Sequence, residues 1–457
     1  MQFDLVIIGG GPAGYHAAAL AGRAGLKTLL VEKRFVGGVC LNEGCVPSKT
    51  LLHSAKIFDY ALRGMDYGVK AEQISFDHLK VIERKNKVVK ILTAGVKNKL
   101  KKNNVTLIED TGEIVGINHA GITIKAAESQ YTGKQLLIAS GSVPVIPPII
   151  GMTEALERDY VLTSEQIFDL KKIPESLVVI GGGAIGLELV AYFNTAGSKV
   201  TIIEMLDHIG GETEREIGEI LLNNYRKKGV EFKLNSKVTA VKEGAVQFET
   251  NGLTELIEAE TVLLSVGRKP FVTGLGLEKI GLVEENGRLK VDDFGRTSRP
   301  GVYAAGDVNG RSMLAHTAYR EAEVCINNIL GGNESINYDS IPSVIYTEPE
   351  VASVGETPES AAKKGIECEV VKTSMRYSGR YLAENEGGDG ICKLVMDKRD
   401  RRLLGMSLIS RYASELIYGV GLMIEKRMTV DEIEKVVFPH PTVSEIIKEG
   451  VFQFSLK

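Results

Sequence analysis

The feature that most constrains this chain is a strand, loop, helix, strand and acid unit that occurs twice. In the first copy the apolar run LVII at 5–8 leads into GGGPAG at 9–14, which matches G-x-G-x-x-G. A helix-like run at 17–21, a second apolar run at 28–31 and Glu32 complete it. The glycines allow a helix N-terminus to approach a pyrophosphate, and the acid accepts hydrogen bonds from a ribose. The unit therefore predicts a dinucleotide-binding fold.

The second copy repeats the first at the same internal spacing. LVVI at 177–180 is followed by GGGAIG at 181–186, a helix-like run, an apolar run at 200–203 and Glu204. The first glycine and the acid are 23 residues apart in both copies, since 32 − 9 and 204 − 181 are equal. Both copies also end alike, in LIASGSVP at 137–144 and LLSVGRKP at 263–270. We therefore predict an α/β protein with two Rossmann-like domains.

The first copy is longer, and the excess contains a pair of cysteines. From first to last glycine the copies span 132 residues (141 − 9) and 86 residues (267 − 181), a difference of 46. The excess includes a predicted long helix at 76–103 and the stretch GGVCLNEGCVPSK at 37–49, with Cys40 and Cys45. A disulfide needs Cα atoms closer than about 7 Å, whereas five residues of helix rise about 7.5 Å. The pair therefore cannot lie within one ideal helix.

We expect Cys40 on an irregular turn and Cys45 just ahead of a helix that begins near Pro47. The positive end of the helix dipole would lower the pKa of a thiolate there and make it more reactive. From the spacing alone, a structural disulfide, a metal site and two unrelated buried thiols remain alternatives. A zinc site lacks a second ligand pair, because His53 alone does not complete a tetrahedron, and no metal is expected.

Composition excludes several classes of protein. The chain has 457 residues, 44% of them apolar and 25% charged, with a net charge of −4, so nothing indicates a nucleic-acid partner. It has no apolar run long enough to span a membrane, and MQFD leads straight into the first strand. We therefore expect the cytoplasm, unless an organelle presequence has been removed. Thiols there are kept reduced, which favours a cycling disulfide over a permanent one.

Two dinucleotide sites and one dithiol predict an electron relay. A flavin is the usual intermediary between a nicotinamide and a disulfide, so the first module, which carries the cysteines, is expected to bind FAD. The second is then expected to bind the nicotinamide dinucleotide. Glu204 would repel a 2′-phosphate, and no arginine occurs between it and Arg215, so NAD is favoured over NADP.

Several long motifs carry a resemblance to a known family. They are GGGPAG, GGVCLNEGCVPSK and GGGAIGLE, a segment at 297–307 ending in VYAAGD, LAH at 314–316, YTEPE at 346–350 and HPTVSE at 440–445. Over essentially its whole length the chain resembles the pyridine nucleotide-disulfide oxidoreductases, and within them the dihydrolipoamide dehydrogenases. The resemblance implies a homodimeric enzyme that uses FAD and NAD⁺ to reoxidise dihydrolipoyl groups of a small molecule or a lipoyl domain. It also implies that a 2-oxoacid dehydrogenase or glycine cleavage complex is the partner, without indicating which.

The resemblance assigns roles around the dithiol. Cys40 resembles the thiol that exchanges with substrate, and Cys45 the thiol that forms a charge-transfer contact with the flavin. Lys49 and Glu188 resemble an ion pair beside the flavin, although the sequence alone equally allows Lys49 to be solvated. Asp307 resembles the carboxylate that holds the flavin ribityl chain, and its alternative is a turn residue after Gly306.

His440 and Glu445 resemble an acid–base pair that serves the cysteines of the other subunit. The imidazole would accept a thiol proton, with Glu445 orienting the ring. His440 lies between Pro439 and Pro441, which stiffen the chain, and one of the two X-Pro bonds is a candidate for cis. Glu445 has a second explanation, because 442–445 spells a T-x-x-E capping box.

The resemblance extends to the cofactor sites. The expected FAD-binding residues are Gly9, Gly11, Pro12, Ala13, Gly14, Glu32, Lys33, Gly38, Val39, Lys49, Gly112, Ser140, Gly141, Asp307, Leu314, Ala315 and His316. The expected NAD-binding residues are Gly181, Gly183, Ile185, Gly186, Glu188, Glu204, Val266 and Gly267. The LAH triplet is the variant typical of lipoamide enzymes and argues against a glutathione reductase.

Four regions are expected along the chain. They are an FAD-binding domain at 1–146, an NAD-binding domain at 147–268, a central domain completing the FAD site at 269–335, and an α+β dimerisation domain at 336–457. Two other functions stay open. One is an NADH-dependent reductase of another low-molecular-weight disulfide, and the other is a non-catalytic redox-sensing flavoprotein.

Overall fold

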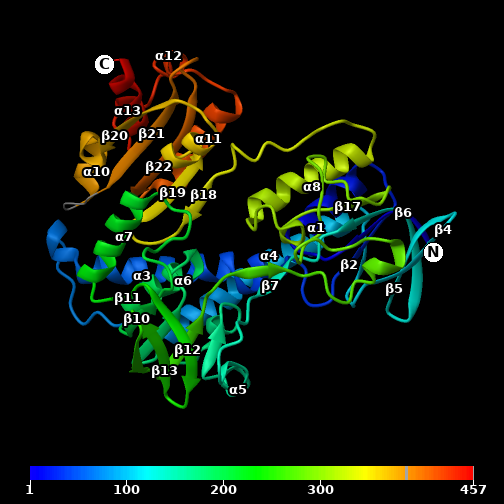
Figure 1. Cartoon of the computed structure of the whole chain (residues 1–457), viewed down its shortest axis with the longest axis horizontal. Helices are drawn as coiled ribbons and strands as arrows, with labels where there is room; N and C mark the ends of the chain where they lie inside the picture. The colour runs from blue at the N-terminus through cyan, green and yellow to red at the C-terminus, as the bar shows by residue number, and fades with distance from the viewer. Residues whose placement is uncertain (386–389, 456–457) are drawn as a thin grey trace.

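The computed structural model describes residues 1–385 and 390–455, so the last two residues of the expected dimerisation domain and its residues 386–389 lie outside the description. Three bodies are visible in Figure 1. The first module lies on the right with the N-terminus, the second lies at the lower left, and the C-terminal region lies at the upper left. Helices of the first module extend to the left between the other two bodies.

A seven-stranded sheet forms the first body, in the order β3-β2-β1-β6-β5-β4 with β17 also paired to β6. Strands β1, β2, β3 and β17 run parallel to their neighbours, whereas β4 and β5 form an antiparallel extension. Helices α1 and α8 pack against each other beside the sheet. The elements are β1 (Gln2–Ile8), α1 (Pro12–Arg23), β2 (Thr28–Val31), β3 (Thr106–Ile108), β4 (Glu113–Asn118), β5 (Gly121–Ala126), β6 (Ser129–Ile138), β17 (Val302–Ala304) and α8 (Ala315–Ile329).

The excess of the first module is helical, and the cysteine segment differs from expectation. It comprises α2 (Gly38–Glu43), α3 (Cys45–Leu62), the short turn η1 (Gly64–Tyr67) and α4 (His78–Lys102). Cys40 lies within a short helix, not on an irregular turn, and the next helix begins at Cys45 itself. Gly37 and Gly38 take positive φ angles that start α2, and Gly44 breaks the helix at φ −147°, ψ −110°. The pair therefore straddles a helix break, as its spacing requires.

The second body repeats the plan with a five-stranded parallel sheet in the order β11-β10-β9-β15-β8. An antiparallel sheet, β12-β13-β14, packs beside it. The elements are α5 (Met152–Glu157), β8 (Val161–Thr163), η2 (Gln166–Asp169), β9 (Ser176–Ile180), α6 (Ala184–Thr195), β10 (Lys199–Ile203), α7 (Arg215–Lys227), β11 (Glu231–Lys233), β12 (Ser236–Lys242), β13 (Ala245–Thr250), β14 (Leu253–Glu258) and β15 (Thr261–Leu264). Strand β9 is almost fully buried, as its apolar run predicts.

A two-stranded sheet joins the two modules where their matching ends meet. Strand β7 (Ser142–Pro144) pairs antiparallel with β16 (Arg268–Pro270). The chain then returns to the first body through two short turns, η3 (Leu277–Ile280) and η4 (Asp307–Asn309). The duplicated ends thus hold the modules together.

The C-terminal body is an antiparallel sheet, β18-β19-β22-β21-β20, covered by helices. Its elements are β18 (Ser343–Ile345), β19 (Glu350–Gly355), α9 (Pro358–Lys363), β20 (Cys368–Ser374), η5 (Met375–Tyr377), α10 (Gly379–Glu384), β21 (Ile391–Asp397), β22 (Leu403–Ser410), α11 (Ala413–Glu425), α12 (Val430–Ile433) and α13 (Glu445–Ser455). This agrees with the expected α+β composition. Among the described residues no helix has both the length and the apolar character of a membrane span.

Candidate active site

The first glycine loop has the shape that a dinucleotide pyrophosphate requires. Gly9 has a φ of +102°, and a Cβ on Gly14 would lie 1.8 Å from the Gly9 carbonyl oxygen. Helix α1 begins without a side-chain cap and without an acid in its first turn, so its N–H groups are free to meet an anion. The second loop matches it, because Gly181 has a φ of +103° and Gly183 has open space around it. Both loops fit a pyrophosphate.

The two acids that close the modules hold the glycine loops from the side. Glu32 accepts hydrogen bonds from the backbone N–H of Gly10 at 2.6 Å and of Arg34 at 2.7 Å. Glu204 accepts them from the backbone N–H of Gly182 at 2.6 Å and of Leu206 at 2.8 Å. Each carboxylate thus lies beside its loop, where a ribose hydroxyl would meet it.

Cys40 and Cys45 are free thiols in the structure, and they differ electrostatically. A hydrogen bond from the Cys40 thiol, together with the nearby Lys49 ammonium, lowers the pKa of Cys45 against the opposing effect of burial. The same hydrogen bond and burial raise the pKa of Cys40. Cys45 is also the first residue of α3, where the helix dipole favours a thiolate. Cys45 is therefore the thiol that ionises first.

Lys49 and Glu188 come from different modules and form an ion pair. Lys49 Nζ lies 2.8 Å from Glu188 Oε2, and Glu188 also accepts hydrogen bonds from Ser48 Oγ at 2.8 Å and from the Tyr346 backbone N–H at 3.1 Å. Lys49 Nζ lies 4.0 Å from the centre of the Tyr346 ring. Glu188 is buried on α6. Lys49 is therefore held by an ion pair with its side chain 34% exposed, and its contact with a flavin stays a prediction.

Asp307 lies in the first turn after β17 and is held by the linker sheet. Ser142 Oγ donates to Asp307 Oδ2 at 2.5 Å. Burial raises the pKa of Asp307, and this hydrogen bond opposes the rise. The preceding residue is fixed as well, because the Gly306 N–H donates to the buried Glu321 carboxylate at 2.6 Å.

His440 and Glu445 form a pair at the surface of the C-terminal body. His440 Nδ1 lies 2.8 Å from Glu445 Oε1, while Glu445 Oε2 accepts the Thr442 N–H at 2.9 Å. Glu445 thus both orients the ring and caps the start of α13. The peptide bond between His440 and Pro441 is cis. The His440 side chain is 80% exposed, so it is available to another molecule.

The other expected FAD residues lie around the first loop. Gly38 packs so closely that a Cβ on it would come 2.6 Å from the Gly11 Cα. Lys33 lies 3.8 Å above the Phe271 ring, and Ser140 Oγ donates to the Phe271 carbonyl at 2.6 Å. At α8, Leu314 is the N-cap, Ala315 the first residue, and His316 Nε2 lies 2.7 Å from the Pro342 carbonyl. Gly112 packs against β1 and β2. Their contacts with FAD stay predictions.

The expected NAD residues gather at the carboxyl edge of the second sheet. Gly183 caps α6, Ile185 and Gly186 lie in its first turn, and Val266 and Gly267 follow β15. A Cβ on Gly186 would lie 2.6 Å from the Gly181 carbonyl oxygen. These residues share one edge of the sheet, where such folds bind ligands.

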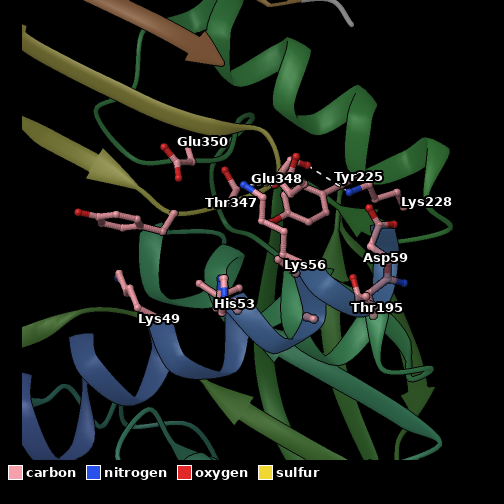
Figure 2. A pocket seen from close by; sticks show the side chains of 15 residues that line it. Lys49, His53, Lys56, Asp59, Thr195, Tyr225, Lys228, Thr347, Glu348 and Glu350 are labelled. Atoms are coloured by element: carbon pink, nitrogen blue, oxygen red, sulfur yellow. Dashed lines mark hydrogen bonds and ion pairs between the residues drawn. The ribbon is translucent and has the colours of Figure 1, made fainter. Parts of the chain in front are cut away.

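A cavity of about 200 Å³ extends from Lys49 between the modules and the C-terminal body (Figure 2). Lys49, His53 and Lys56 line it from α3. Lys228, whose pKa is lowered by burial, donates to the Glu348 carbonyl at 3.2 Å across it. Sequence reasoning missed this cavity, because its lining comes from all three bodies. Lys49 and the YTEPE motif were the available signals.

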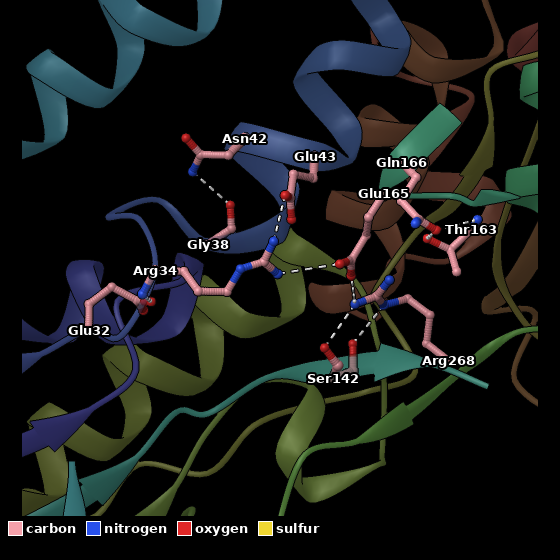
Figure 3. A network of polar contacts seen from close by, with 10 residues as sticks. All are labelled: Glu32, Arg34, Gly38, Asn42, Glu43, Ser142, Thr163, Glu165, Gln166 and Arg268. Atoms are coloured by element: carbon pink, nitrogen blue, oxygen red, sulfur yellow. Dashed lines mark hydrogen bonds and ion pairs between the residues drawn. The ribbon is translucent and has the colours of Figure 1, made fainter. Parts of the chain in front are cut away.

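A chain of polar contacts was also missed (Figure 3). Arg34 binds Glu43 and Glu165, and Arg268 binds Glu165 and Ser142. Glu43 belongs to GGVCLNEGCVPSK, Ser142 to LIASGSVP and Arg268 to LLSVGRKP, whereas Arg34 and Glu165 belong to no motif. Nothing in the pattern of residues signals that they meet.

Three comparisons with known proteins agree with this geometry. The pyridine nucleotide-disulphide oxidoreductase model matches residues 3–322, and the dimerisation domain of the same family matches residues 341–451. The chain is 38% identical to dihydrolipoyl dehydrogenase of Geobacillus stearothermophilus, covering 98% of this chain and 96% of the relative. It is 36% identical to mitochondrial dihydrolipoyl dehydrogenase 1 of Arabidopsis thaliana, covering 98% and 89%.

Solved structures resemble it over their whole length. LpdA from Mycobacterium tuberculosis superimposes with a TM-score of 0.90 at 26% identity, covering 99% of each chain. The HOCl-induced flavoprotein disulfide reductase RclA from Escherichia coli, in its Cu(II) complex, reaches 0.87 at 26% identity and covers 99% of each. The predicted fold class and the cofactors FAD and NAD(H) are confirmed. The chain belongs to the pyridine nucleotide-disulphide oxidoreductase family and carries its dimerisation domain.

Proposed function

We propose that the enzyme reoxidises dihydrolipoyl groups with NAD⁺. The observation that carries the proposal is the asymmetric thiol pair, in which Cys40 donates a hydrogen bond to the more acidic Cys45 beside Lys49. Such a pair supplies one thiol for exchange and one thiolate for electron transfer. The names of relatives that match over almost the full chain support dihydrolipoyl groups as the substrate.

The cycle begins with Cys40 and Cys45 joined in a disulfide. A substrate thiol loses its proton to His440 and attacks Cys40, which forms a mixed disulfide and releases Cys45 as a thiolate. The second substrate thiol then loses its proton and attacks the substrate sulfur bonded to Cys40, which closes the lipoyl disulfide; Cys40 leaves with that proton as a thiol. Two electrons have moved from the substrate to the cysteine pair. The first glycine loop, Glu32 and Asp307 would hold FAD, which would supply the electron-transfer chemistry between the cysteine pair and NAD⁺.

The protein's own residues position these groups. We propose that Gly9, Gly11, Gly14 and Glu32 hold the FAD diphosphate and ribose, while Asp307 meets the ribityl chain. Lys49, which Glu188 holds in place, lowers the pKa of Cys45 through its positive charge, whereas the Glu188 carboxylate raises it. Gly181, Gly183, Gly186 and Glu204 would bind NAD⁺ rather than NADP⁺, because the Glu204 carboxylate repels a 2′-phosphate.

We propose a homodimer in which His440 serves the cysteines of the second subunit. His440 is exposed and lies in the body that matches the dimerisation domain. Large apolar side chains are exposed on α3 and on α11, among them Ile57, Tyr60, Tyr418 and Leu422. Exposed apolar groups of this kind favour burial against another chain. We also propose a lipoyl-bearing multienzyme complex as partner and the cytoplasm as compartment.

Steady-state turnover tests the substrate. Dihydrolipoamide with NAD⁺ is expected to give kcat/KM at least about a hundredfold above NADP⁺, since the like charge at Glu204 costs binding of the phosphorylated cofactor. Glutathione disulfide with NADH or NADPH serves as the comparison, because the likeness to RclA keeps another disulfide reductase as a second candidate. Reduction of the enzyme by one equivalent without turnover would support a redox sensor instead.

Subunit complementation tests the action of His440 in trans. Cys40→Ser and His440→Gln homodimers are each expected to be nearly inactive with dihydrolipoamide. Mixed dimers of the two contain one site with an intact cysteine pair and an intact histidine if the residues come from different subunits. Activity recovered on mixing would support the trans arrangement. If the mixed dimers stay inactive although mass measurement shows that they form, His440 acts within its own chain or not at all.

A further inference from the structure

A continuous series of side-chain contacts links the redox loop to Asp307. Glu43, the last residue of α2, accepts from Arg34 at 2.6 Å, and Arg34 donates to Glu165 at 3.4 Å. Glu165 accepts from Arg268 at 3.0 Å, and Arg268 Nε donates to Ser142 Oγ at 2.8 Å. Ser142 then donates to Asp307. Figure 3 shows the series from Glu43 to Ser142.

Glu165 is the member that joins the two ends. It follows β8 at the edge of the second sheet, whereas Arg34 follows β2 in the first sheet and Arg268 opens β16 of the linker. Its two carboxylate oxygens bind different arginines, Oε1 to Arg268 and Oε2 to Arg34. The carboxylate thus separates two guanidinium groups that would otherwise repel each other.

The ion pair between Arg268 and Glu165 is expected to stabilise the structure more than an ordinary surface ion pair does. The side chains of Arg268 and Glu165 are only 12% and 16% exposed, so water and salt screen their attraction less. At the other end of the series, the Arg34 side chain is 45% exposed. Its charge lowers the pKa of Glu43, against the burial that raises it. Glu43 lies between the two cysteines in the sequence, and its Oε2 is buried without a hydrogen-bond partner among the described residues. Arg34 therefore supplies the positive charge that opposes the rise in the pKa of Glu43.

We propose that Glu165 is a positioning residue of the redox centre: by holding Arg34 and Arg268 together, it fixes the segment between Cys40 and Cys45 relative to Asp307. The proposal rests on the proposed function, which places Asp307 at the flavin and the cysteines beside it. One carboxylate of the second module would thus set the geometry of a site that lies in the first module. Glu165 itself contacts neither sulfur in the structure and takes no part in bond making.

The first test uses the holoenzyme and the variant Glu165→Gln. The amide keeps the shape of the side chain but loses the charge between the arginines. We expect FAD to leave about tenfold faster, measured by the rise of flavin fluorescence on dilution into mild denaturant, since a charged hydrogen bond is lost. We also expect weaker long-wavelength thiolate-to-flavin absorbance after two-electron reduction. Glu260→Gln is the matched control, because Glu260 pairs with Lys172 in the same module away from this series.

Two further variants separate the ends of the series. Arg34→Gln is expected to weaken the thiolate-to-flavin absorbance without changing FAD release, because it detaches Glu43 and leaves the Arg268–Ser142–Asp307 contacts intact. Ser142→Ala is expected to speed FAD release without changing the absorbance. In the Ser142→Ala background, Glu165→Gln is expected to speed FAD release by a smaller factor than it does alone. These two variants carry the test if Glu165→Gln does not fold.

The outcomes are distinguishable. If the wild-type enzyme lacks the long-wavelength absorbance, the proposed function fails before the variants are compared. If the wild type shows it and Glu165→Gln matches Glu260→Gln in both FAD release and absorbance, Glu165 has no positioning role. A lower unfolding temperature with both readouts unchanged would also overturn the proposal, because it would show a structural role only. If Glu165→Gln does not fold, the proposal is overturned when Arg34→Gln and Ser142→Ala both match the control.

Discussion

The two dinucleotide modules share a glycine-loop geometry and differ in what covers it. Gly9 and Gly181 have φ angles of +102° and +103°, and each closing acid accepts a loop N–H at 2.6 Å. A Cβ on Gly11, however, would meet the Gly38 Cα at 3.9 Å, whereas nothing lies within 4 Å of a Cβ on Gly183. The segment that carries the cysteines thus packs on Gly11, whereas the corresponding Gly183 is open; the middle glycine of each loop is contacted in both modules, Gly10 by Gly37 and Gly182 by Gly210.

The difference teaches how one fold serves two kinds of ligand. The covered loop suits a cofactor that stays bound, because α2 closes over the start of α1. The open loop suits a dinucleotide that must enter and leave in each cycle. On the proposed assignment, the first loop would hold the resident flavin and the second the exchanging nicotinamide dinucleotide, according to what the excess helices of the first module place beside it.

The largest expected effect comes from removing the sulfur that distinguishes the first module. Cys45→Ser should abolish the thiolate-to-flavin absorbance and lower turnover with dihydrolipoamide by at least about 10³-fold, because serine cannot form the disulfide. Absorbance spectra and steady-state rates measure this. Cys368→Ser is the control, since that cysteine lies on β20 in the C-terminal body. If the absorbance band survives in Cys45→Ser, Cys45 is not the thiolate beside the flavin, and this sulfur does not distinguish the two modules.

Adding one methyl group to each loop tests the division of ligands. Gly14→Ala places a Cβ 1.8 Å from a backbone oxygen and should leave the purified protein with little flavin. Gly186→Ala places one 2.6 Å from the Gly181 oxygen and should keep the flavin while raising KM for NAD⁺ by about tenfold or more. The ratio of visible to ultraviolet absorbance reports the flavin. Flavin loss in Gly186→Ala alone would reverse the assignment of the modules.

Exchange of one acid tests the nucleotide preference of the open module. Glu204→Gln keeps an acceptor for one of the two backbone N–H groups, those of Gly182 and Leu206, and removes the charge. The ratio of kcat/KM for NADPH to that for NADH should rise by about tenfold, because the repulsion of a 2′-phosphate is lost. The flavin content should not change. If both cofactors weaken equally, Glu204 shapes the loop and does not select the nucleotide.

The smallest effect concerns stability and pH in the first module. Burial raises the pKa of Asp307, so the folded state binds this proton more tightly than the unfolded state does. The carboxylate therefore costs stability as the pH rises through the ordinary Asp range and up to the raised pKa. Asp307→Asn removes that dependence.

In the apoprotein, Asp307→Asn should be at least as stable as the wild type at pH 7, with a smaller advantage near pH 4. Urea unfolding at the two pH values measures this. The holoenzyme variant should release FAD about tenfold faster, because a charged hydrogen bond is lost. A variant apoprotein less stable than the wild type at both pH values would show that Ser142 and Arg268 stabilise the carboxylate more than burial opposes it.

Local patterns were enough to place most of the fold. The apolar runs at 5–8 and 177–180 became β1 and β9, and the run at 76–103 became α4, which Asp77 caps through its side chain. These predictions rest on neighbouring residues whose periodicity and caps act within one element. The position of Cys40 was wrong in detail, because the positive φ angles of Gly37 and Gly38 start a short helix that the apolar pattern does not reveal.

The sequence by itself determined the duplicated modules, the dithiol and the residues expected to bind each dinucleotide, because each is encoded in a short stretch of chain. Only the tertiary structure decided which groups from different modules meet. The Lys49–Glu188 pair, the Glu43-to-Asp307 series and the cavity beside Lys49 each join residues more than a hundred positions apart. Such contacts depend on how whole sheets pack, and no local pattern of polarity specifies a partner on another sheet.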